Sequence, residues 1–135
     1  MTTAQRRELI ARAVAAKETS YSPYSRFRVG AAVLTDDGSI FDGCNVENAS
    51  YGLAICAERN AIFRMAHAGQ RSLVAVAVTS DHPSFITPCG ACRQVIAEFA
   101  AKGTVVLLVS AKGRVKRVPF ERIFPTPPDL ASLKK

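Results

Sequence analysis

The chain has 135 residues, of which 48% are hydrophobic, and its formal net charge at pH 7 is +7. This length suits one compact unit that buries about two-thirds of its unfolded surface, so we expect residues 1–135 to form a single domain. The longest apolar run, residues 73–79, is far shorter than the roughly 20 residues of a membrane span, and the Ala-rich start after Arg6 and Arg7 lacks the apolar core of a secretion signal. We therefore expect a cytoplasmic protein with no membrane partner.

The positive charge is concentrated at the end of the chain. From residue 112 onward there are seven basic and two acidic residues, which supply five of the seven net charges. No run of aromatic residues interleaves these charges to stack bases. A solvated face or a contact between subunits is therefore favoured over a nucleic-acid groove, and we expect no nucleic-acid partner.

Periodicity and turn residues divide the first half of the chain. Thr2 and Gln5 form a capping-box pattern ahead of an amphipathic helix. The turn Asp36-Asp37-Gly38 predicts a hairpin, since glycine supplies the positive φ that such turns need. The predicted elements are a helix over 3–20, strands over 28–34 and 39–44, and a loop over 45–54.

The second half alternates helices with apolar runs. Its predicted elements are helices over 55–67 and 89–101, strands over 73–79, 104–109 and 114–118, and a short helix over 119–124. The two longest apolar runs are rich in β-branched residues, which is typical of strands covered on both faces. This order of elements predicts an α/β fold, a three-layer sandwich around a mixed sheet of about five strands.

Three cysteines and one glutamate form the pattern with the most chemical content. Cys56 precedes Ala57 and Glu58 at the start of one predicted helix, and Cys89 and Cys92 lie in the first turn of another. Residues three apart share a helix face, so one metal ion can bind both sulfurs of the second helix and the single sulfur of the first. Three thiolate ligands hold Zn²⁺ and leave its fourth position open, as in catalytic sites.

The neighbouring residues suit a catalytic metal. Both helix starts favour the thiolate form of the cysteines. Zinc with an open position brings the pKa of a bound water toward roughly 7, and Glu58 is close enough to act as a proton shuttle without ligating the metal. Arg59, and less favourably Arg93, can donate hydrogen bonds to the sulfurs and offset their charge, although a solvated helix residue is an equally good interpretation of either.

Other interpretations of the cysteines are weaker. A structural zinc site normally uses four ligands, and neither His67 nor His82 is well placed as the fourth. A redox pair of the thioredoxin type would leave Cys56 without a role. Cys44 is interpreted as a small buried apolar residue in a strand, because a fourth thiolate would close the metal site.

The motifs resemble those of the small, homotetrameric, zinc-dependent cytidine deaminases of pyrimidine salvage. The resemblance covers about residues 21–99. It is carried by residues 24–32, 43–51, 56–59 and 88–94, which read YSRFRVGAA, GCNVENASY, CAER and PCGACRQ. It implies a cytidine deaminase-like fold, one Zn²⁺ per subunit held by Cys56, Cys89 and Cys92, and Glu58 as the proton shuttle.

The same resemblance implies substrate contacts. Phe27 matches the ring that packs against the pyrimidine, Asn45 and Glu47 match the pair that binds the ribose hydroxyls, and the backbone of Ala57 matches the contact to the base carbonyl. Tyr51 matches a position near the substrate and the subunit interface. Without the resemblance, Phe27 would be interpreted as a core residue, Asn45 as a turn residue and Glu47 as a surface acid.

The implied reaction is hydrolytic deamination of cytidine and 2′-deoxycytidine to uridine and 2′-deoxyuridine, by a homotetramer whose neighbouring subunits complete each pocket. One departure concerns the lid, because Pro128 stands about where many relatives carry a Phe that reaches a neighbour's active site. The alternatives are a deaminase of a modified nucleoside or of a nucleoside antibiotic such as blasticidin S, a polynucleotide deaminase, and, from a different class, a zinc-stabilised nucleic-acid-binding module.

Overall fold

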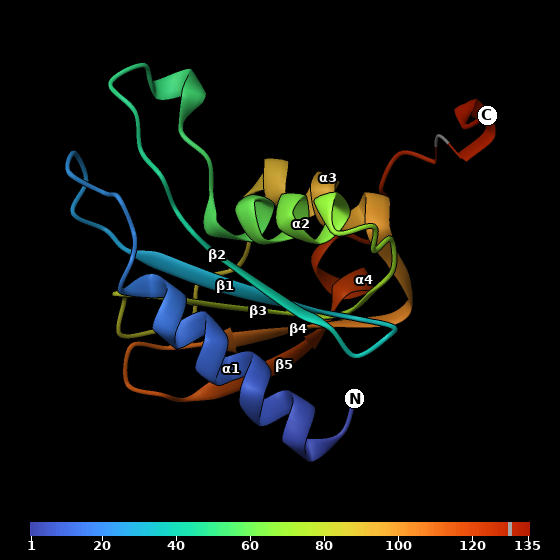
Figure 1. The fold of residues 1–135 in the computed structure, drawn as a ribbon, viewed down its shortest axis with the longest axis horizontal. Coiled ribbons are helices and arrows are strands. Elements are labelled where there is room, and N and C mark those ends of the chain that lie inside the picture. Colours follow the sequence, from blue (N-terminus) through green and yellow to red (C-terminus); the bar gives the residue numbers. More distant parts are fainter. Residues whose placement is uncertain (130) are drawn as a thin grey trace.

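The computed structural model describes residues 1–129 and 131–135. Figure 1 shows the elements, which are α1 (Thr3–Lys17), β1 (Val29–Thr35), β2 (Ile40–Cys44), α2 (Ala57–His67), β3 (Leu73–Ser80), α3 (Gly90–Phe99), β4 (Ala100–Val109), β5 (Val115–Pro119) and α4 (Phe120–Ile123). Short 3₁₀ helices cover Tyr51–Leu53 and Ala131–Leu133. Among the described residues, no helix combines the length and the apolar composition that crossing a membrane requires.

The five strands form one mixed sheet in the order β2-β1-β3-β4-β5. Only β3 and β4 run parallel, and the other three pairs are antiparallel. Helix α1 covers one face, whereas α2, α3 and α4 lie on the other (Figure 1). The predicted three-layer α/β sandwich around a mixed five-stranded sheet is therefore confirmed.

The sheet separates two apolar cores, because successive side chains of a strand point to opposite faces. Val33 packs with Ile62 of α2 and Ile96 of α3 on one face, and its neighbour Leu34 packs with Leu9 of α1 on the other. All five side chains are at most 1% exposed. Burial on both faces explains why the central strands read as continuous apolar runs.

The helices begin and end differently from the sequence prediction. Thr2 and Gln5 form the expected capping box, but α1 ends at Lys17 instead of residue 20. Cys56 and Cys89 are the N-cap residues of α2 and α3 and have extended backbone angles, so each lies just outside its helix. An N-cap is half in and half out of the helix, which leaves its side chain at the helix start.

Strand β4 begins four residues before the predicted start at residue 104. Gly103, at φ 87°, makes an irregularity that lets Ala100 pair with Leu73. The hydroxyl of Thr104 stabilises this irregularity. It donates to the carbonyl of Leu73 at 2.8 Å and accepts from the N–H of Ala101 at 2.9 Å. The prediction missed this segment because it continued the preceding helix to Ala101, whereas α3 ends at Phe99.

Two glycines bring helices into direct contact with strands. A Cβ on Gly30 would lie 2.2 Å from the carbonyl oxygen of Ala13, and one on Gly43 would lie 2.6 Å from the backbone nitrogen of Ala61. Real Cβ atoms do not approach backbone atoms so closely, so only glycine fits at these two crossings. Gly43 thereby sets the end of β2 against the start of α2.

Short backbone pairings extend this junction. Val46 and Ile55 exchange two hydrogen bonds of 3.0 Å, and Tyr21 donates to the carbonyl of Asn45 at 3.0 Å. The backbone N–H of Glu47 donates to the carbonyl of Tyr21 at 2.8 Å. The segments around residues 21, 46 and 55 therefore meet beside Cys56.

Both edges of the sheet are blocked against further pairing. On β2, three carbonyls that do not face β1 accept hydrogen bonds from helix side chains, namely Ile40 from Arg12 at 3.4 Å, Asp42 from Arg64 at 2.7 Å and Cys44 from Asn60 at 2.9 Å. On β5, Lys116 and Arg117 are exposed, and lysine or arginine on an edge strand opposes association. Both residues belong to the basic end of the chain, for which the sequence favours a solvated face or a contact between subunits.

Candidate active site

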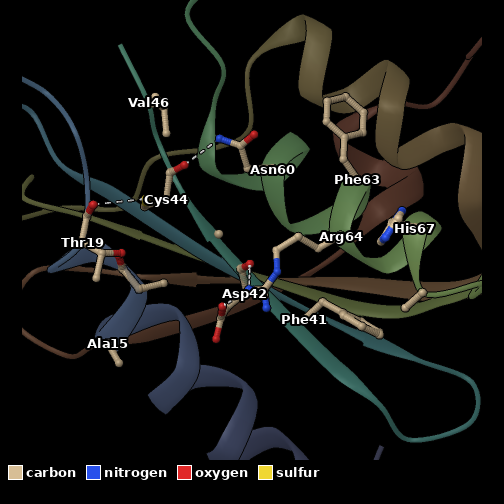
Figure 2. Close-up of a pocket in the computed structure, with 13 residues that line it drawn as sticks. Ala15, Thr19, Phe41, Asp42, Cys44, Val46, Asn60, Phe63, Arg64 and His67 are labelled. Carbon is tan, nitrogen blue, oxygen red and sulfur yellow. Dashed lines mark hydrogen bonds and ion pairs between the residues drawn. The ribbon is translucent and has the colours of Figure 1, made fainter.

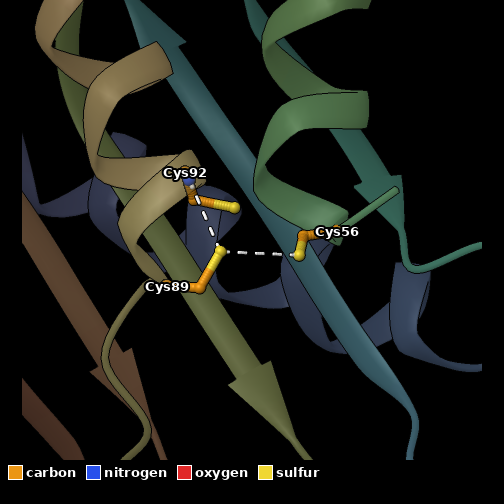
Figure 3. Close-up of side chains that lie close together, drawn as sticks. All are labelled: Cys56, Cys89 and Cys92. Atoms are coloured by element: carbon orange, nitrogen blue, oxygen red, sulfur yellow. Dashed lines mark hydrogen bonds between the residues drawn. The ribbon is translucent and has the colours of Figure 1, made fainter. Parts of the chain in front are cut away.

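The three cysteines of the sequence pattern meet between the starts of α2 and α3. Figure 3 shows Cys56 at the start of α2, facing Cys89 and Cys92 at the start of α3. Their Sγ atoms all lie within 4.8 Å of one another, and those of Cys56 and Cys89 are 3.7 Å apart. The backbone N–H of Cys92 also points at the Sγ of Cys89, at 3.5 Å.

These dimensions fit a zinc ion. A tetrahedral zinc with Zn–S bonds of about 2.3 Å separates its sulfurs by about 3.8 Å. The 3.7 Å between the sulfurs of Cys56 and Cys89 matches that edge, and all three sulfurs lie within 4.8 Å of one another. Within the described ranges, 1–129 and 131–135, no fourth His, Cys, Asp or Glu joins the group. The cluster is thus positioned to bind one zinc ion through three thiolates.

Cys44 stands apart from the cluster, as expected, but it is not fully buried. Its Sγ donates to the carbonyl of Thr19 at 3.4 Å, and the residue is half-buried. The prediction of a buried apolar residue is wrong because β2 is an edge strand, whose outer side no further strand covers.

The sulfurs share negative charge before any cation binds. A hydrogen bond from the Cys92 thiol lowers the pKa of Cys56 to about 5, helped by Arg59 and Cys89 and opposed by burial. The same hydrogen bond, together with burial and the charge of Glu58, raises the pKa of Cys92. One thiolate and one thiol therefore satisfy each other, and a divalent cation stabilises both as thiolates.

Arg59 faces the sulfurs, whereas Arg93 does not. Nη2 of Arg59 donates to the Sγ of Cys56 at 3.5 Å, and this bond raises the pKa of the guanidinium. Its Nε is buried and has no partner in the part of the chain that the structure describes. Arg93 donates instead to the carbonyls of Pro88 at 2.8 Å and Ile123 at 2.9 Å, so it braces the start of α3 against α4.

Glu58 is the buried acid beside this cluster. It is the second residue of α2 and only 4% exposed. Burial raises the pKa of its carboxyl to about 7, and the charge of Cys56 adds to the effect. A carboxyl with a pKa near neutrality can both accept and donate a proton at physiological pH. Ala57, fully buried just before it, has a backbone N–H in the first turn, where helix N–H groups lack helical partners.

Asn45 and Glu47 hold the segment that carries Phe27. Asn45 donates from Nδ2 to the carbonyl of Phe27 at 2.8 Å and accepts at Oδ1 from the N–H of Val29 at 2.9 Å. Glu47 accepts from the backbone N–H groups of residues 24 and 25, at 2.9 and 3.1 Å, and from the hydroxyl of Ser25, which lowers the pKa of the carboxyl. Sequence reasoning missed Ser25, whose only signal was its place in the segment 24–32.

Glu47 also borders a hollow of about 330 Å³. Tyr51, which is 83% exposed, lines it together with Tyr24, Asn48 and neighbouring residues. Phe27 is half-buried and lies outside this lining. The candidate residues therefore form two groups, one of the cysteines with Glu58 and Arg59, the other of the loop residues around Glu47.

A larger hollow, of about 910 Å³, lies between α1 and α2 over the edge strand β2 and contains none of the three clustered cysteines. In Figure 2 the rings of Phe41 and Phe63 flank it, and Asp42 joins Arg64 across it. Phe63 is 48% exposed and Val46 is 43% exposed. Much of its lining is therefore apolar and open to solvent.

Comparisons with known proteins agree with this site. The sequence model described as "Cytidine and deoxycytidylate deaminase zinc-binding region" matches residues 3–108. A cytidine deaminase of Halalkalibacterium halodurans is 48% identical over 120 residues, which are 89% of this chain and 91% of that protein. One of Mycobacterium tuberculosis H37Rv is 46% identical over 99 residues, or 73% of this chain and 72% of that protein.

Solved structures give the same result. The crystal structure of a cytidine deaminase from Burkholderia pseudomallei superposes with a TM-score of 0.84 at 45% identity, covering 94% of this chain and 99% of that one. A cytidine deaminase structure from Mycobacterium leprae gives a TM-score of 0.77 at 38% identity, covering 90% and 98%. The chain belongs to the cytidine and deoxycytidylate deaminase family.

Proposed function

We propose that the protein is a hydrolase that deaminates cytidine and 2′-deoxycytidine to uridine and 2′-deoxyuridine and depends on zinc. The observation that carries this proposal is the meeting of three sulfurs within 4.8 Å beside the buried carboxyl of Glu58. The names of the relatives support the substrate, since those described above are cytidine deaminases.

In this proposal each residue of the metal group has one task. Cys56, Cys89 and Cys92 hold the zinc ion, which when bound polarises a water molecule and lowers its pKa toward about 7. Glu58 takes a proton from the attacking water and gives it to N3 of the ring, then takes the proton of the new hydroxyl on C4 and gives it to the amino group, which leaves as ammonia while C4 becomes a carbonyl. Arg59 offsets the negative charge of the thiolates, which would otherwise weaken the polarisation of the water.

The loop residues bind the nucleoside. Phe27 stacks on the base, a contact worth about 1–3 kcal/mol, and the N–H of Ala57 donates to the base carbonyl. Asn45 and Glu47 bind the ribose hydroxyls, and Tyr51 borders the same pocket. Support comes from unused bonding capacity, because the amide of Asn45 has a second N–H and the ionised Glu47 has a further acceptor position.

The proposal extends to assembly. We expect a homotetramer of single-domain chains, acting in pyrimidine salvage in the cytoplasm, in which neighbouring subunits complete each pocket. The exposed apolar side chains of Tyr51, Leu53 and Phe63 support contacts between copies, as does the hollow in Figure 2. Light scattering of the purified protein at several concentrations measures this directly.

The deciding experiment is an assay of ammonia release from cytidine, with and without a zinc chelator. We expect turnover that the chelator abolishes and added zinc restores. Turnover of blasticidin S but not cytidine would favour an antibiotic deaminase, and ammonia release from single-stranded oligonucleotide would favour a polynucleotide deaminase. Salt-dependent oligonucleotide binding without any nucleoside turnover would support a zinc-stabilised binding module instead.

A further inference from the structure

Arg28 and Asp81 form a dense set of contacts outside the metal group. The guanidinium of Arg28 donates to both carboxylate oxygens of Asp81, from Nε and Nη2, each at 3.0 Å. The backbone N–H of Arg28 adds a third bond of 3.0 Å to the same carboxylate, and the N–H of Asp81 donates to the carbonyl of Arg28 at 3.1 Å. This geometry requires the planar fork of arginine and is unavailable to lysine.

The end of α1 supports this pair with charges of both signs. Lys17 places its Nζ 3.4 Å from Oδ1 of Asp81, and Glu18 accepts from Nη1 of Arg28 at 2.9 Å. The four side chains form a small network of alternating charge. Networks hold their geometry better than isolated surface ion pairs do.

The pair lies where two functional segments leave the sheet. Arg28 directly follows Phe27 and precedes β1, and Asp81 directly follows β3 and begins the segment that leads to Cys89. The pair therefore joins the segment that carries the aromatic ring to the one that delivers a metal ligand. Neither residue belongs to the cysteine cluster or to the hollow beside Glu47.

The backbone of Phe27 depends on such attachments. Arg26, the residue before it, has φ 57°, a conformation that costs a non-glycine residue free energy. The N–H of Phe27 donates to the hydroxyl of Ser25 at 3.0 Å, and its carbonyl accepts from Asn45. On the side toward the sheet, Arg28 adds its bonds to Asp81 beside the bond from Val29 to Asn45.

We propose that Arg28, held by Asp81, is a positioning residue that fixes the ring of Phe27 for stacking on the pyrimidine. This inference rests on the proposed function for its kinetic readout. Stacking stabilises the bound ground state and the transition state alike. Loss of the contacts between Arg28 and Asp81 therefore raises KM and leaves kcat nearly unchanged. A pair that served stability alone would change neither constant.

The chain offers a closely matched control. Arg12 and Asp42 form an ion pair at 2.7 Å whose side chains are 37% and 27% exposed, against 41% and 28% for Arg28 and Asp81. Arg12 lies on α1, away from the segment of Phe27. The variants Arg28→Lys and Arg12→Lys both keep the charge and lose the guanidinium contact to an aspartate, which runs through Nε in Arg12 and through Nε and Nη2 in Arg28.

The experiment compares the two variants in the zinc-loaded protein. We expect Arg28→Lys to raise KM for cytidine about tenfold, with kcat within about twofold of wild type. We expect Arg12→Lys to leave KM unchanged, although it loses about as much thermal stability as Arg28→Lys. Asp81→Asn should raise KM like Arg28→Lys, and the double variant should be no worse than either single one. Equal KM values in Arg28→Lys and Arg12→Lys would overturn the proposal.

Amide hydrogen exchange separates this inference from the proposed function. We expect exchange at residues 24–28 to rise about tenfold in Arg28→Lys and to stay unchanged in Arg12→Lys. If the wild-type protein does not deaminate cytidine, the proposed function fails, but exchange still reports whether Arg28 orders this segment. Unchanged exchange at Phe27 would reject the positioning role whatever the activity.

Discussion

Nδ2 of Asn45 donates a 2.8 Å hydrogen bond to the carbonyl of Phe27, a residue 18 positions earlier in the chain. The same carboxamide accepts from the N–H of Val29 through its oxygen, at 2.9 Å. Asn45 therefore spans the residues on both sides of Arg28. It shapes the loop that carries Phe27 before any substrate binds.

Replacing Asn45 by Asp tests this structural role. The change keeps an acceptor for Val29 but turns a carboxylate oxygen toward the carbonyl of Phe27, where two acceptors repel. We expect a loss of about 1–3 kcal/mol in the free energy of unfolding, measured by urea denaturation. Asn48→Asp is the control, since Oδ1 of Asn48 accepts from Ser50 at 2.9 Å and a carboxylate does the same. Equal stability of the two variants would contradict the role of the Phe27 contact.

Glu58→Gln separates proton transfer from folding. Gln has nearly the same shape as Glu and carries no charge, so the buried site tolerates it and the metal group is unaltered. We expect full zinc content and unchanged melting temperature, with turnover of cytidine reduced about 10²–10⁴-fold. Glu121→Gln, at an exposed position of α4, should keep wild-type turnover. Substantial activity in Glu58→Gln would rule out the proton-shuttle role.

Metal content distinguishes the clustered cysteines from the fourth cysteine. Cys89→Ala removes one of the three sulfurs, and two protein ligands hold zinc far more weakly than three. We expect near-complete loss of zinc after dialysis, measured by elemental analysis of the purified protein. Cys44→Ala should keep one zinc ion per chain, because its thiol donates to the carbonyl of Thr19 and is not part of the cysteine cluster. A fully loaded Cys89→Ala protein would show that this sulfur is not a ligand.

The order of the elements and the metal group were predictable from the sequence for clear physical reasons. Apolar runs covered on both faces identify β3 and β4 by their composition alone. Cys89 and Cys92 share a helix start, so their spacing directly encodes proximity. Cys56 could be assigned to the same metal group because Glu58, two residues later, is an acid that suits a proton shuttle beside a catalytic metal.

Other features depend on tertiary contacts that no local pattern encodes. Nothing near Arg28 indicates that its partner is Asp81, 53 positions later. The half-exposure of Cys44 follows from the position of β2 at the sheet edge, which requires the strand order. Gly43 looked like an ordinary strand residue, and its need for close contact with α2 appears only once the helix is placed.

Gly43→Ala tests that close contact. The added Cβ would lie 2.6 Å from the backbone nitrogen of Ala61 and 2.9 Å from the carbonyl oxygen of Ala57, so the helix must move. We expect a loss of about 1–3 kcal/mol in the free energy of unfolding and weaker zinc binding, because α2 carries Cys56 at its start. Gly52→Ala is the control, since a Cβ there meets no atom within 4 Å. Equal melting temperatures for the two variants would contradict the packing argument.

The pH dependence of stability provides the last prediction. Hydrogen bonds from Arg28 lower the pKa of Asp81 from its ordinary 3.8 to about 2, with Lys17 adding to the effect. A carboxyl whose pKa is lowered by folding stabilises the protein above pH 4, and this contribution disappears as the pH falls toward 2. Because the side chains are partly solvated, we expect the carboxylate of Asp81 to contribute only about 1 kcal/mol to the free energy of unfolding. The difference in free energy of unfolding between wild type and Asp81→Asn, measured in urea, should therefore shrink between pH 5 and pH 2.5. Glu18 accepts from Nη1 of the same guanidinium, so Glu18→Gln serves as the comparison. A difference in free energy of unfolding between wild type and Asp81→Asn that stays constant with pH would show that the ion pair does not stabilise the fold.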